Sequence, residues 1–538
     1  MSNTITSRQR TGILATMCLA LVAVVASVAG LNVALNELAV ELGASSSQIL
    51  WIVNAYTLTM AALLLPIGEW GDRFGRRRML LVGLAIFGGA NLAAVTVVDG
   101  AQAMIALRAV AGLGAAMIMP ATLSTLTAVF PEEERGRAVG IWAGFAGAGG
   151  ILGLFSSAVL IDYTTWQWLF ALPVVAAVLA AIATIALVPE TRHEHAPRFD
   201  LLGAALSVLA VGGIVMGVEE GPHLGWTDPV VLLGLIGGAV ALAGFVAAQL
   251  RTEHPLLDVR IFSDRALSVS AFSLAILFAL MLGSFLVVIQ LLQAVLGYSA
   301  VTAAAGLLPM AAAMMGLSPV APRIADRFGL TNVLTVGAVA MAVAFGWLAV
   351  ADASYLGIMP PLVLLGAAMG LSMSPATTAI TEALPAERQG LASALNDTVR
   401  EAGSALGIAL IGSTLASGYG DSITSTTDTL PEELAEPVGE GIGQALAVAG
   451  QLGPEGVTIA QAAQTAFLDG WTLAMFVAAA ASVVSAVGIR QIGRIRPDTI
   501  GPETTDSDLV GPNTVRTSDV LIRSYLMHSR RLQLHYCP

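Results

Sequence analysis

The stretch Gly68-Glu69-Trp70-Gly71-Asp72-Arg73-Phe74-Gly75-Arg76-Arg77-Arg78 is the most informative part of this sequence. It separates two apolar runs, 49–70 and 79–98, each long enough to cross a bilayer. Its glycines let two helix ends approach and turn sharply, and the Asp72 carboxylate can sit against the positive N-terminus of a neighbouring helix. The arginine cluster can hold the loop at the inner membrane surface. The stretch therefore predicts a short inner loop between two membrane-spanning helices.

Composition extends this prediction to the whole chain. Of the 538 residues, 56% are hydrophobic and only 12% are charged, against about 25% charged in soluble domains. A soluble multidomain enzyme is therefore excluded. The net charge of −12 argues against nucleic acid as a partner. All 25 basic residues are arginine, which makes them clean markers of topology.

Apolar runs of helix length predict fourteen spans. Barrel strands would alternate apolar and polar residues, and these runs do not, so we expect an all-α integral membrane protein. The runs are 11–35, 49–70, 79–98, 102–129, 138–160, 168–188, 201–218, 230–250, 267–293, 301–321, 333–350, 355–379, 391–415 and 466–488.

The arginines fix a predicted orientation. With the N-terminus inside, every arginine outside the spans falls in a cytoplasmic segment, as the positive-inside rule requires. Only Arg108 and Arg400 lie within spans. Acidic residues gather instead in the predicted outer loop 416–466. We expect a multi-pass protein of the cell membrane with both termini in the cytoplasm.

An internal repeat divides the spans into two halves. Gly71-Asp72-Arg73-Phe74-Gly75 recurs as Ala325-Asp326-Arg327-Phe328-Gly329, at an offset of 254 residues that other short matches share. Two six-helix halves with a site between them are the architecture of a secondary transporter. The predicted parts are a cytoplasmic N-terminus 1–10, a first half 11–188, two inserted helices with flanking loops 189–265, a second half 266–488 and a cytoplasmic, disordered tail 489–538.

The opening stretch closely resembles the signature of the major facilitator superfamily, and fourteen spans point to its drug:proton antiporter branch. The resemblance covers residues 10–490. It implies that Asp72 meets the start of the span 391–415 as a cytoplasmic latch, and the repeat implies that Asp326 does the same at the span 138–160. A simple topology anchor is the alternative. The residues of this predicted gate are Gly68, Gly71, Asp72, Arg73, Gly75, Arg76, Arg77, Asp326 and Arg327.

Arg108, in Arg108-Ala109-Val110-Ala111-Gly112-Leu113-Gly114, resembles the second motif of the family, where this residue is linked to proton transfer. An arginine inside a membrane is costly and is usually functional or paired. The alternatives are an ion pair or hydrogen bonds to carbonyl groups. Several glycines should allow close helix packing, namely Gly112, Gly149, Gly153, Gly403 and Gly407.

Two positions depart from the family pattern. Leu154 stands where the antiporter motif of the fifth span has proline, so the expected kink is lost and export as the direction is less firmly implied. Ser27 stands where the first span carries an aspartate, which removes the usual cation-binding carboxylate. We therefore expect neutral or zwitterionic substrates to be handled better than dications, and a proton carrier elsewhere in the chain.

The best candidates for that carrier lie in Asn396-Asp397-Thr398-Val399-Arg400-Glu401, which resembles the penultimate span of the family. Asp397 and Glu401 share a helix face, and Arg400 can pair with Asp397 at i+3. A carboxylate at this depth can take up and release a proton unless it is paired. We predict Glu401 as proton carrier, with Asp397, Arg400 and Arg108 assisting. The alternative is a neutral packing cluster.

Other polar residues give weaker predictions. Glu219 and Glu220 close the seventh span and are most simply a solvated loop. His193-Glu194-His195 is expected to be loop rather than a metal site, and we expect no metal, no cofactor beyond a proton gradient and no enzymatic activity. Side chains that could line a central substrate cavity are Asn32, Asn54, Tyr56, Gln290 and Gln293.

The sequence therefore predicts proton-coupled export of amphipathic small molecules across the bacterial inner membrane. The expected partners are a small-molecule substrate and the lipid bilayer, with the monomer as the functional unit. A proton-independent facilitator of a metabolite or lipid is the alternative, and a non-transporting membrane sensor is a remote one.

Overall fold

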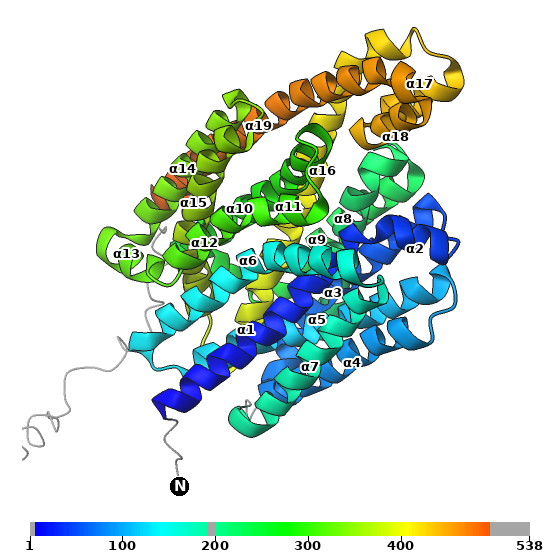
Figure 1. The fold of residues 1–538 in the computed structure, drawn as a ribbon. Coiled ribbons are helices and arrows are strands. Elements are labelled where there is room, and N and C mark those ends of the chain that lie inside the picture. The colour runs from blue at the N-terminus through cyan, green and yellow to red at the C-terminus, as the bar shows by residue number, and fades with distance from the viewer. Residues whose placement is uncertain (1–5, 192–198, 495–538) are drawn as a thin grey trace, which may run out of the picture. The chain divides into compact units, whose positions relative to one another are not determined.

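The computed structural model of the chain describes residues 6–191 and 199–494. The side chains of five residues within these ranges are outside the description: Asn32, Val33, Asn36, Ser46 and His223. Every regular element in the described part is a helix, and fourteen stretches are long and apolar enough to span a membrane. The all-helical fold predicted from the sequence is confirmed (Figure 1).

Six spans precede the predicted insertion, and long apolar runs with few interior polar residues explain their helical form. Ser45 caps α3 through a reciprocal pair of hydrogen bonds with Gln48, so the second span begins sharply. The helices are α1 (Ser7–Ala29), α2 (Leu35–Glu41), α3 (Ser46–Phe74), α4 (Arg76–Thr96), α5 (Ala101–Val129), α6 (Glu132–Tyr163) and α7 (Gln167–Leu187).

Two further spans, α8 (Leu201–Leu224) and α9 (Pro229–Gln249), form a hairpin. Asp200 and Asp228 each cap the first turn of the helix that follows them. The hairpin closes tightly because Gly213 and Gly217 of α8 face Gly234 and Gly238 of α9, and a Cβ atom at any of the four would clash with the opposite helix.

The remaining six spans lie between α10 and α19. The tenth span, Ala300–Leu317, is broken into two short helices, and a third short helix follows it, since prolines at 309, 319 and 322 interrupt the backbone hydrogen bonding. The helices are α10 (Arg265–Gln290), α11 (Ala300–Gly306), α12 (Leu308–Leu317), α13 (Ala321–Phe328), α14 (Leu330–Val350), α15 (Tyr355–Glu382), α16 (Gln389–Thr427), α17 (Glu432–Glu440), α18 (Ile442–Leu452) and α19 (Val457–Arg494).

The segment 416–466, predicted as an outer loop, is mostly helical. Helix α16 continues to Thr427, α17 and α18 follow, and α19 already begins at Val457. Alanine is the most frequent residue here and favours helix, so most of the chain stays helical beyond the length that a bilayer requires, with breaks at Pro431, Gly441 and Gly453. The short helix α17 packs against the extended end of α16, where the Tyr419 hydroxyl donates to the Val438 carbonyl over 2.8 Å, and α18 packs between α17 and α19 (Figure 1).

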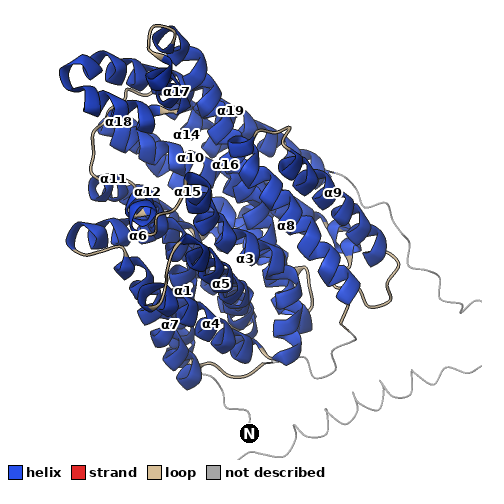
Figure 2. Cartoon of the chain, turned by 90° about the vertical axis from the view of Figure 1, so that its right-hand side faces the viewer, coloured by secondary structure: helices blue, strands red, loops and turns tan. Residues whose placement is uncertain are grey.

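Contacts between the two halves centre on α16. It packs against α3 and α5 of the first half and against α10 and α19 of the second, while α6 packs against α12 and α15. Helix α8 also touches α3 and α16 (Figure 2). The polar residues of α16 therefore lie where both halves and the inserted hairpin meet.

Candidate functional site

The loop between α3 and α4 is tied to the start of α16. Asp72 is buried and its two carboxylate oxygens accept hydrogen bonds from the backbone amides of Gly390, over 2.8 Å, and Leu391, over 3.0 Å. Arg76 also donates to Asp72 over 2.9 Å. A carboxylate on free amides at a helix N-terminus is favoured by the helix dipole. This is the contact that the family resemblance implies, and its role as a latch remains a prediction.

Glycine makes this contact possible. A Cβ atom at Gly68 would collide with Ala394 and the Gly390 carbonyl, and one at Gly390 would collide with the Gly68 carbonyl. Gly71 differs, because a Cβ atom there would meet Met79 at an ordinary 3.9 Å. Gly75 has φ of +107°, which only glycine adopts without strain. Gly68 and Asp72 are four residues apart, about one helical turn, so both lie on the face of α3 that contacts the start of α16.

The other arginines of this cluster form ion pairs and hydrogen bonds at the same face of the protein. Arg73 pairs with Glu69 over 3.4 Å, and Arg77 donates to the Ile185 carbonyl at the end of α7 over 2.8 Å. Arg388 lies 3.5 Å from Glu69 and also donates to the carbonyls of Pro255 and Leu256, over 3.0 and 2.9 Å. The linker after α9 is thus connected through Arg388 to Glu69, at the end of α3 that also carries Asp72. Sequence reasoning missed Glu69 and Arg388, since no pattern links residues so far apart in the chain.

Asp326 does not repeat the contact that Asp72 makes, contrary to the prediction from the repeat. Asp326 and Arg327 are exposed, and in the described part of the chain Asp326 has no hydrogen bond or ion pair to α6. Helix α13 approaches α6 through Pro322, which lies near Gly136. The first turn of α6 holds Glu132, Glu133 and Glu134, which would repel another carboxylate, whereas the first turn of α16 holds no acid.

Arg108 of α5 is buried, and its guanidinium bonds to α3 and to α1, the first span. Its Nε donates to the Ile52 carbonyl over 3.0 Å, one terminal nitrogen donates to the Ser27 hydroxyl over 3.2 Å, and the guanidinium lies 4.4 Å from the centre of the Tyr56 ring. The other terminal nitrogen is buried and has no hydrogen-bond partner among the described residues. Ser27 therefore occupies the place where the family's aspartate would face this arginine.

The predicted pair in α16 is present. Arg400 donates to the Asp397 carboxylate over 3.1 Å, and Asn396 donates to the same oxygen over 3.2 Å. Asp397 and Arg400 are both buried. The guanidinium of Arg400 lies between the Phe278 ring, at 4.5 Å, and the Trp142 ring, at 5.6 Å, which come from different halves of the protein. This pair therefore lies at the junction between the halves.

Glu401, the predicted proton carrier, has no salt bridge in the described part of the chain and is only partly buried. The charges of Arg400 and Asp397 act on it with opposite sign. A carboxylate that is shielded but uncommitted can change its protonation state, whereas Asp397 is already paired. The proton-carrier role of Glu401 and the alternative of a packing cluster both stay predictions.

Glu219 and Glu220 differ from their predicted place in a solvated loop. Helix α8 extends through both, Glu220 is 6% exposed, and Asn54 donates to it over 3.5 Å. Thr57 donates to Glu219 over 3.2 Å. The apolar run that predicted the seventh span stopped at residue 218, so the sequence pattern ended nearly two turns before the helix does, at Leu224.

The glycines predicted to allow close packing do so. Gly112 lies against the backbone of α3 at Tyr56, Gly149 and Gly153 lie against α1 at Val25 and Ala26, and Gly403 and Gly407 lie against α10 at Ala275 and Ala279. Helix α6 runs unbroken through Leu154, so the kink that proline would cause is absent.

The predicted cavity residues do not form one group. Tyr56 is fully buried and donates to the Val24 carbonyl over 3.1 Å, so it is part of the core. Gln290 and Gln293 are exposed at the end of α10, Asn54 faces Glu220, and the side chain of Asn32 lies outside the described residues. Burial of Tyr56 and exposure of the glutamines could not be read from their positions along single helices.

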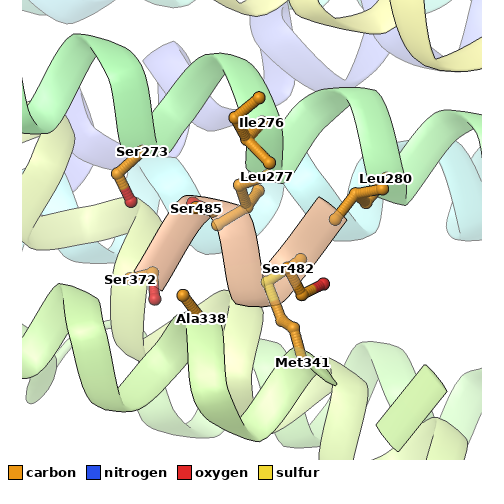
Figure 3. A pocket seen from close by; sticks show the side chains of 9 residues that line it. All are labelled: Ser273, Ile276, Leu277, Leu280, Ala338, Met341, Ser372, Ser482 and Ser485. Carbon is orange, nitrogen blue, oxygen red and sulfur yellow. The ribbon is translucent and has the colours of Figure 1, made fainter. Parts of the chain in front are cut away.

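Two hollows of very different size lie in the described part of the chain. A cavity of about 10 Å³ lies among α10, α14, α15 and α19 and is lined by four serines, Ser273, Ser372, Ser482 and Ser485 (Figure 3). It has room for a water-sized group at most. A cleft of about 400 Å³ lies at the basic face and is lined by charged residues that include Arg76, Arg135 and Glu382. Neither is an apolar pocket at the junction of the halves.

A metal site is not formed by the described residues, among which no group of three His, Cys, Asp or Glu side chains comes together. The segment His193-Glu194-His195 lies outside the described part of the chain.

Fold, repeat and polar junction together define a membrane transporter of two packed six-helix halves. The chain belongs to the Major Facilitator Superfamily, which it matches over residues 17–408. Several of its relatives are named as resistance or export proteins. The "Multidrug resistance protein Stp" of Mycobacterium tuberculosis is 31% identical over 395 residues, 72% of each chain. The "Methyl viologen resistance protein SmvA" of Salmonella typhimurium is 32% identical over 469 residues, covering 85% of this chain and 93% of its own.

A third relative is the "Tetracenomycin C resistance and export protein" of Streptomyces glaucescens, 30% identical over 480 residues, or 86% of this chain and 88% of the relative. Among solved structures, the proton:xylose symporter XylE has a TM-score of 0.57 at 14% identity, with 90% of this chain and 96% of that chain covered. A bacterial homologue of the lysosomal transporter Spinster has a TM-score of 0.57 at 17% identity, with 91% and 98% covered. These structures support the fold alone.

Proposed function

We propose that this protein exports amphipathic small molecules from the cytoplasm across the bacterial inner membrane in exchange for protons. The observation that carries the proposal is the uncommitted carboxylate of Glu401 beside the Asp397–Arg400 pair, at the junction of the two halves. Relatives named for multidrug resistance and drug export support the substrate class. The cytoplasmic side is the face that bears Asp72 and the arginine cluster.

The transport cycle follows from two sets of contacts. With the Asp72 contact formed, the cytoplasmic ends of α3 and α16 are held together, and the junction is closed from that side. Breaking these two amide hydrogen bonds would let the halves rock apart and expose the junction to the cytoplasm. Uptake of a proton at Glu401 removes a charge from the junction and favours release of the substrate. Energy comes from the proton gradient, the bilayer is the only other partner, and the monomer suffices.

The test is drug transport into everted membrane vesicles under an imposed proton gradient. Glu401→Gln and Asp397→Asn should each lower the proton-driven rate at least about tenfold, as loss of a group required in the coupled step does. Glu433→Gln, an exposed acid of α17, is the matched control and should transport like the parent protein. Unchanged rates in both junction variants would refute the assignment.

A proton-independent facilitator is the second candidate, favoured by the unbroken helix α6 at Leu154. The same vesicles distinguish the two functions. A protonophore should abolish concentrative transport by an antiporter and leave downhill transport by a facilitator intact.

A further inference from the structure

The inserted hairpin is built into the transport junction. Helix α8 packs against α3 of the first half and α16 of the second (Figure 2). Its Val215 and Val218 form an apolar contact with Ala61 of α3 and with Ala405 and Ala409 of α16. Because this helix contacts both halves at once, its contacts must change when the halves move relative to one another. It can also place a side chain between them.

Glu219 is the side chain so placed. It follows the apolar contact directly, and Thr57 of α3 donates to its Oε1 over 3.2 Å. Its Oε2 is shielded from solvent and accepts no hydrogen bond from the described residues. A shielded carboxylate oxygen without a donor is unfavourable unless a positive charge or a proton joins it. This oxygen points to a ligand that the protein itself does not supply.

Glu401 lies on α16 one turn before Ala405, which packs against Val215 and Val218 of α8, and its charge acts on Glu219. On its own helix, Glu220 is the nearest acid and is engaged by Asn54. Helix α9 contains no titratable residue, and the charged residues of α3 are Glu69, Asp72 and Arg73 at the basic face. Arg400, the nearest cation to Glu401, is hydrogen-bonded to Asp397. Among the described side chains, which do not include that of His223 on α8, neither glutamate forms a salt bridge with a cation.

We propose that Glu219 and Glu401 form one cation site, completed by the inserted hairpin, which holds either a proton or the positive group of an amphipathic organic cation. The inference deepens the proposed export function and rests on it. Two carboxylates repel in a site of low dielectric constant, and one positive charge relieves this repulsion. Arrival of the organic cation therefore displaces the proton, which is the exchange that an antiporter requires. The carboxylate missing at Ser27 is thus replaced from a helix outside the two halves.

The test measures binding of tetraphenylphosphonium to the purified full-length protein by calorimetry. Glu219→Gln and Glu401→Gln should each weaken binding about tenfold, since each removes one of two charges near the cation. Measurements in buffers of different ionisation enthalpy give the number of protons released. We expect about one proton for the parent protein at neutral pH and less than half of that for either variant. Glu433→Gln should match the parent in both measurements.

The binding affinity and the number of protons released together show whether Glu219 binds the organic cation or the proton. If Glu219→Gln weakens binding even at pH 8.5, Glu219 contacts the organic cation. If affinity is kept and only proton release is lost, Glu219 serves the proton. Parental affinity together with parental proton release in Glu219→Gln would overturn the inference. Glu219→Asp should restore part of the effect, and an unchanged thermal midpoint would show that each variant is folded.

Failure of the export function gives a different result. If the parent protein does not drive tetraphenylphosphonium across everted vesicles under a proton gradient, export of this class is refuted, while the binding measurements still decide whether Glu219 belongs to a cation site. If the parent exports and Glu219→Gln exports at the same rate with the same affinity, the inference fails and the export function stands.

Discussion

At the residue scale, two aspartates with the same local sequence have different surroundings. Asp72 is buried against the free amides of α16, whereas Asp326 is exposed beside an acidic helix start. The repeat in the sequence preserves residue types, but the partner of each aspartate is set by a helix from the other half. A repeat can therefore predict a motif and still miss its contact.

This difference predicts unequal effects of one substitution. Asp72→Asn should lower the transport rate at least about tenfold, because it removes a charge that bonds to two amides and to Arg76. Asp326→Asn should stay within about twofold of the parent, as exposed substitutions usually do. Vesicle transport rates, normalised to protein amount, measure both. Equal loss in the two variants would mean that both aspartates act as latches.

Arg108 gives a second prediction at this scale. One terminal nitrogen of Arg108 bonds to Ser27, and the other has no partner among the described residues. A carboxylate at position 27 could therefore form an ion pair with this guanidinium. Ser27→Asp should raise the thermal midpoint by a few degrees, because a buried arginine gains an ion pair. Ser157→Asp is the control, since Ser157 is also buried but adjoins Gly30. A lower midpoint for Ser27→Asp would show that Arg108 needs no carboxylate.

At the element scale, helix ends and helix crossings determine the site. The sequence predicted the glycine crossings well, because small residues at helical spacing have few other uses in a membrane. It predicted the end of α8 poorly, since Glu219 and Glu220 looked like a loop once the apolar run had stopped. A buried acidic residue interrupts the apolar pattern from which a membrane helix is predicted. Predictions of helix ends are therefore least accurate where a buried acid has a function.

The crossing of α3 and α16 allows a prediction with a matched control. Gly68→Ala should push the two helices apart, weaken the Asp72 contact and lower transport about tenfold, because its Cβ atom meets backbone and Ala394. Gly71→Ala gains the same helix propensity but meets only Met79, at 3.9 Å, and should transport within about twofold of the parent. Equal rates in the two variants would exclude close packing as the cause.

The attachment of the linker after α9 is expected to depend on pH. Partial burial pushes the pKa of Asp200 up, but hydrogen bonds from the Gly203 amide, the Gln249 side chain and the Leu256 amide outweigh burial and hold the pKa below its ordinary value. A lowered pKa in the folded state contributes stability above the unfolded pKa, near 3.9, and this contribution is lost as pH falls through the folded pKa.

Asp200→Asn should therefore be less stable than the parent at pH 7, by about 1 kcal/mol, and the difference should shrink as the pH falls below the ordinary aspartate pKa near 3.9. Thermal midpoints of the purified proteins across this range measure it. A difference that persists at low pH would show that shape rather than charge matters at this position.

At the scale of the whole molecule, the all-helical fold, the span count and the family could be predicted from sequence, because each depends on patterns along the chain. The cation site could not, because Thr57, Glu219 and Glu401 come from three helices whose packing no single pattern records. The helical form of 416–466 was also missed, since acidic residues were interpreted as loop where alanine and glutamate in fact favour helix.

Orientation is a testable property at this scale. In a Cys537→Ser background, Glu433→Cys on α17 should react with an impermeant maleimide from outside intact cells. Glu253→Cys, in the linker after α9, should react only in everted vesicles. Both positions are exposed, and the remaining Cys18 is buried, so it should stay unlabelled. The opposite labelling pattern would invert the predicted topology.

Helix α16 has 39 residues and is therefore about 58 Å long, nearly twice the thickness of the hydrocarbon layer. Its first turn holds Asp72, its middle carries Arg400 and Glu401, and its last turns meet α17. Such a helix acts as a lever: a tilt that frees one end must swing the other. A binder raised against the α17–α18 hairpin, which the predicted topology places outside the cell, should therefore block transport without reaching the junction between the halves. A drug that binds at the junction should in turn change the exposure of this hairpin.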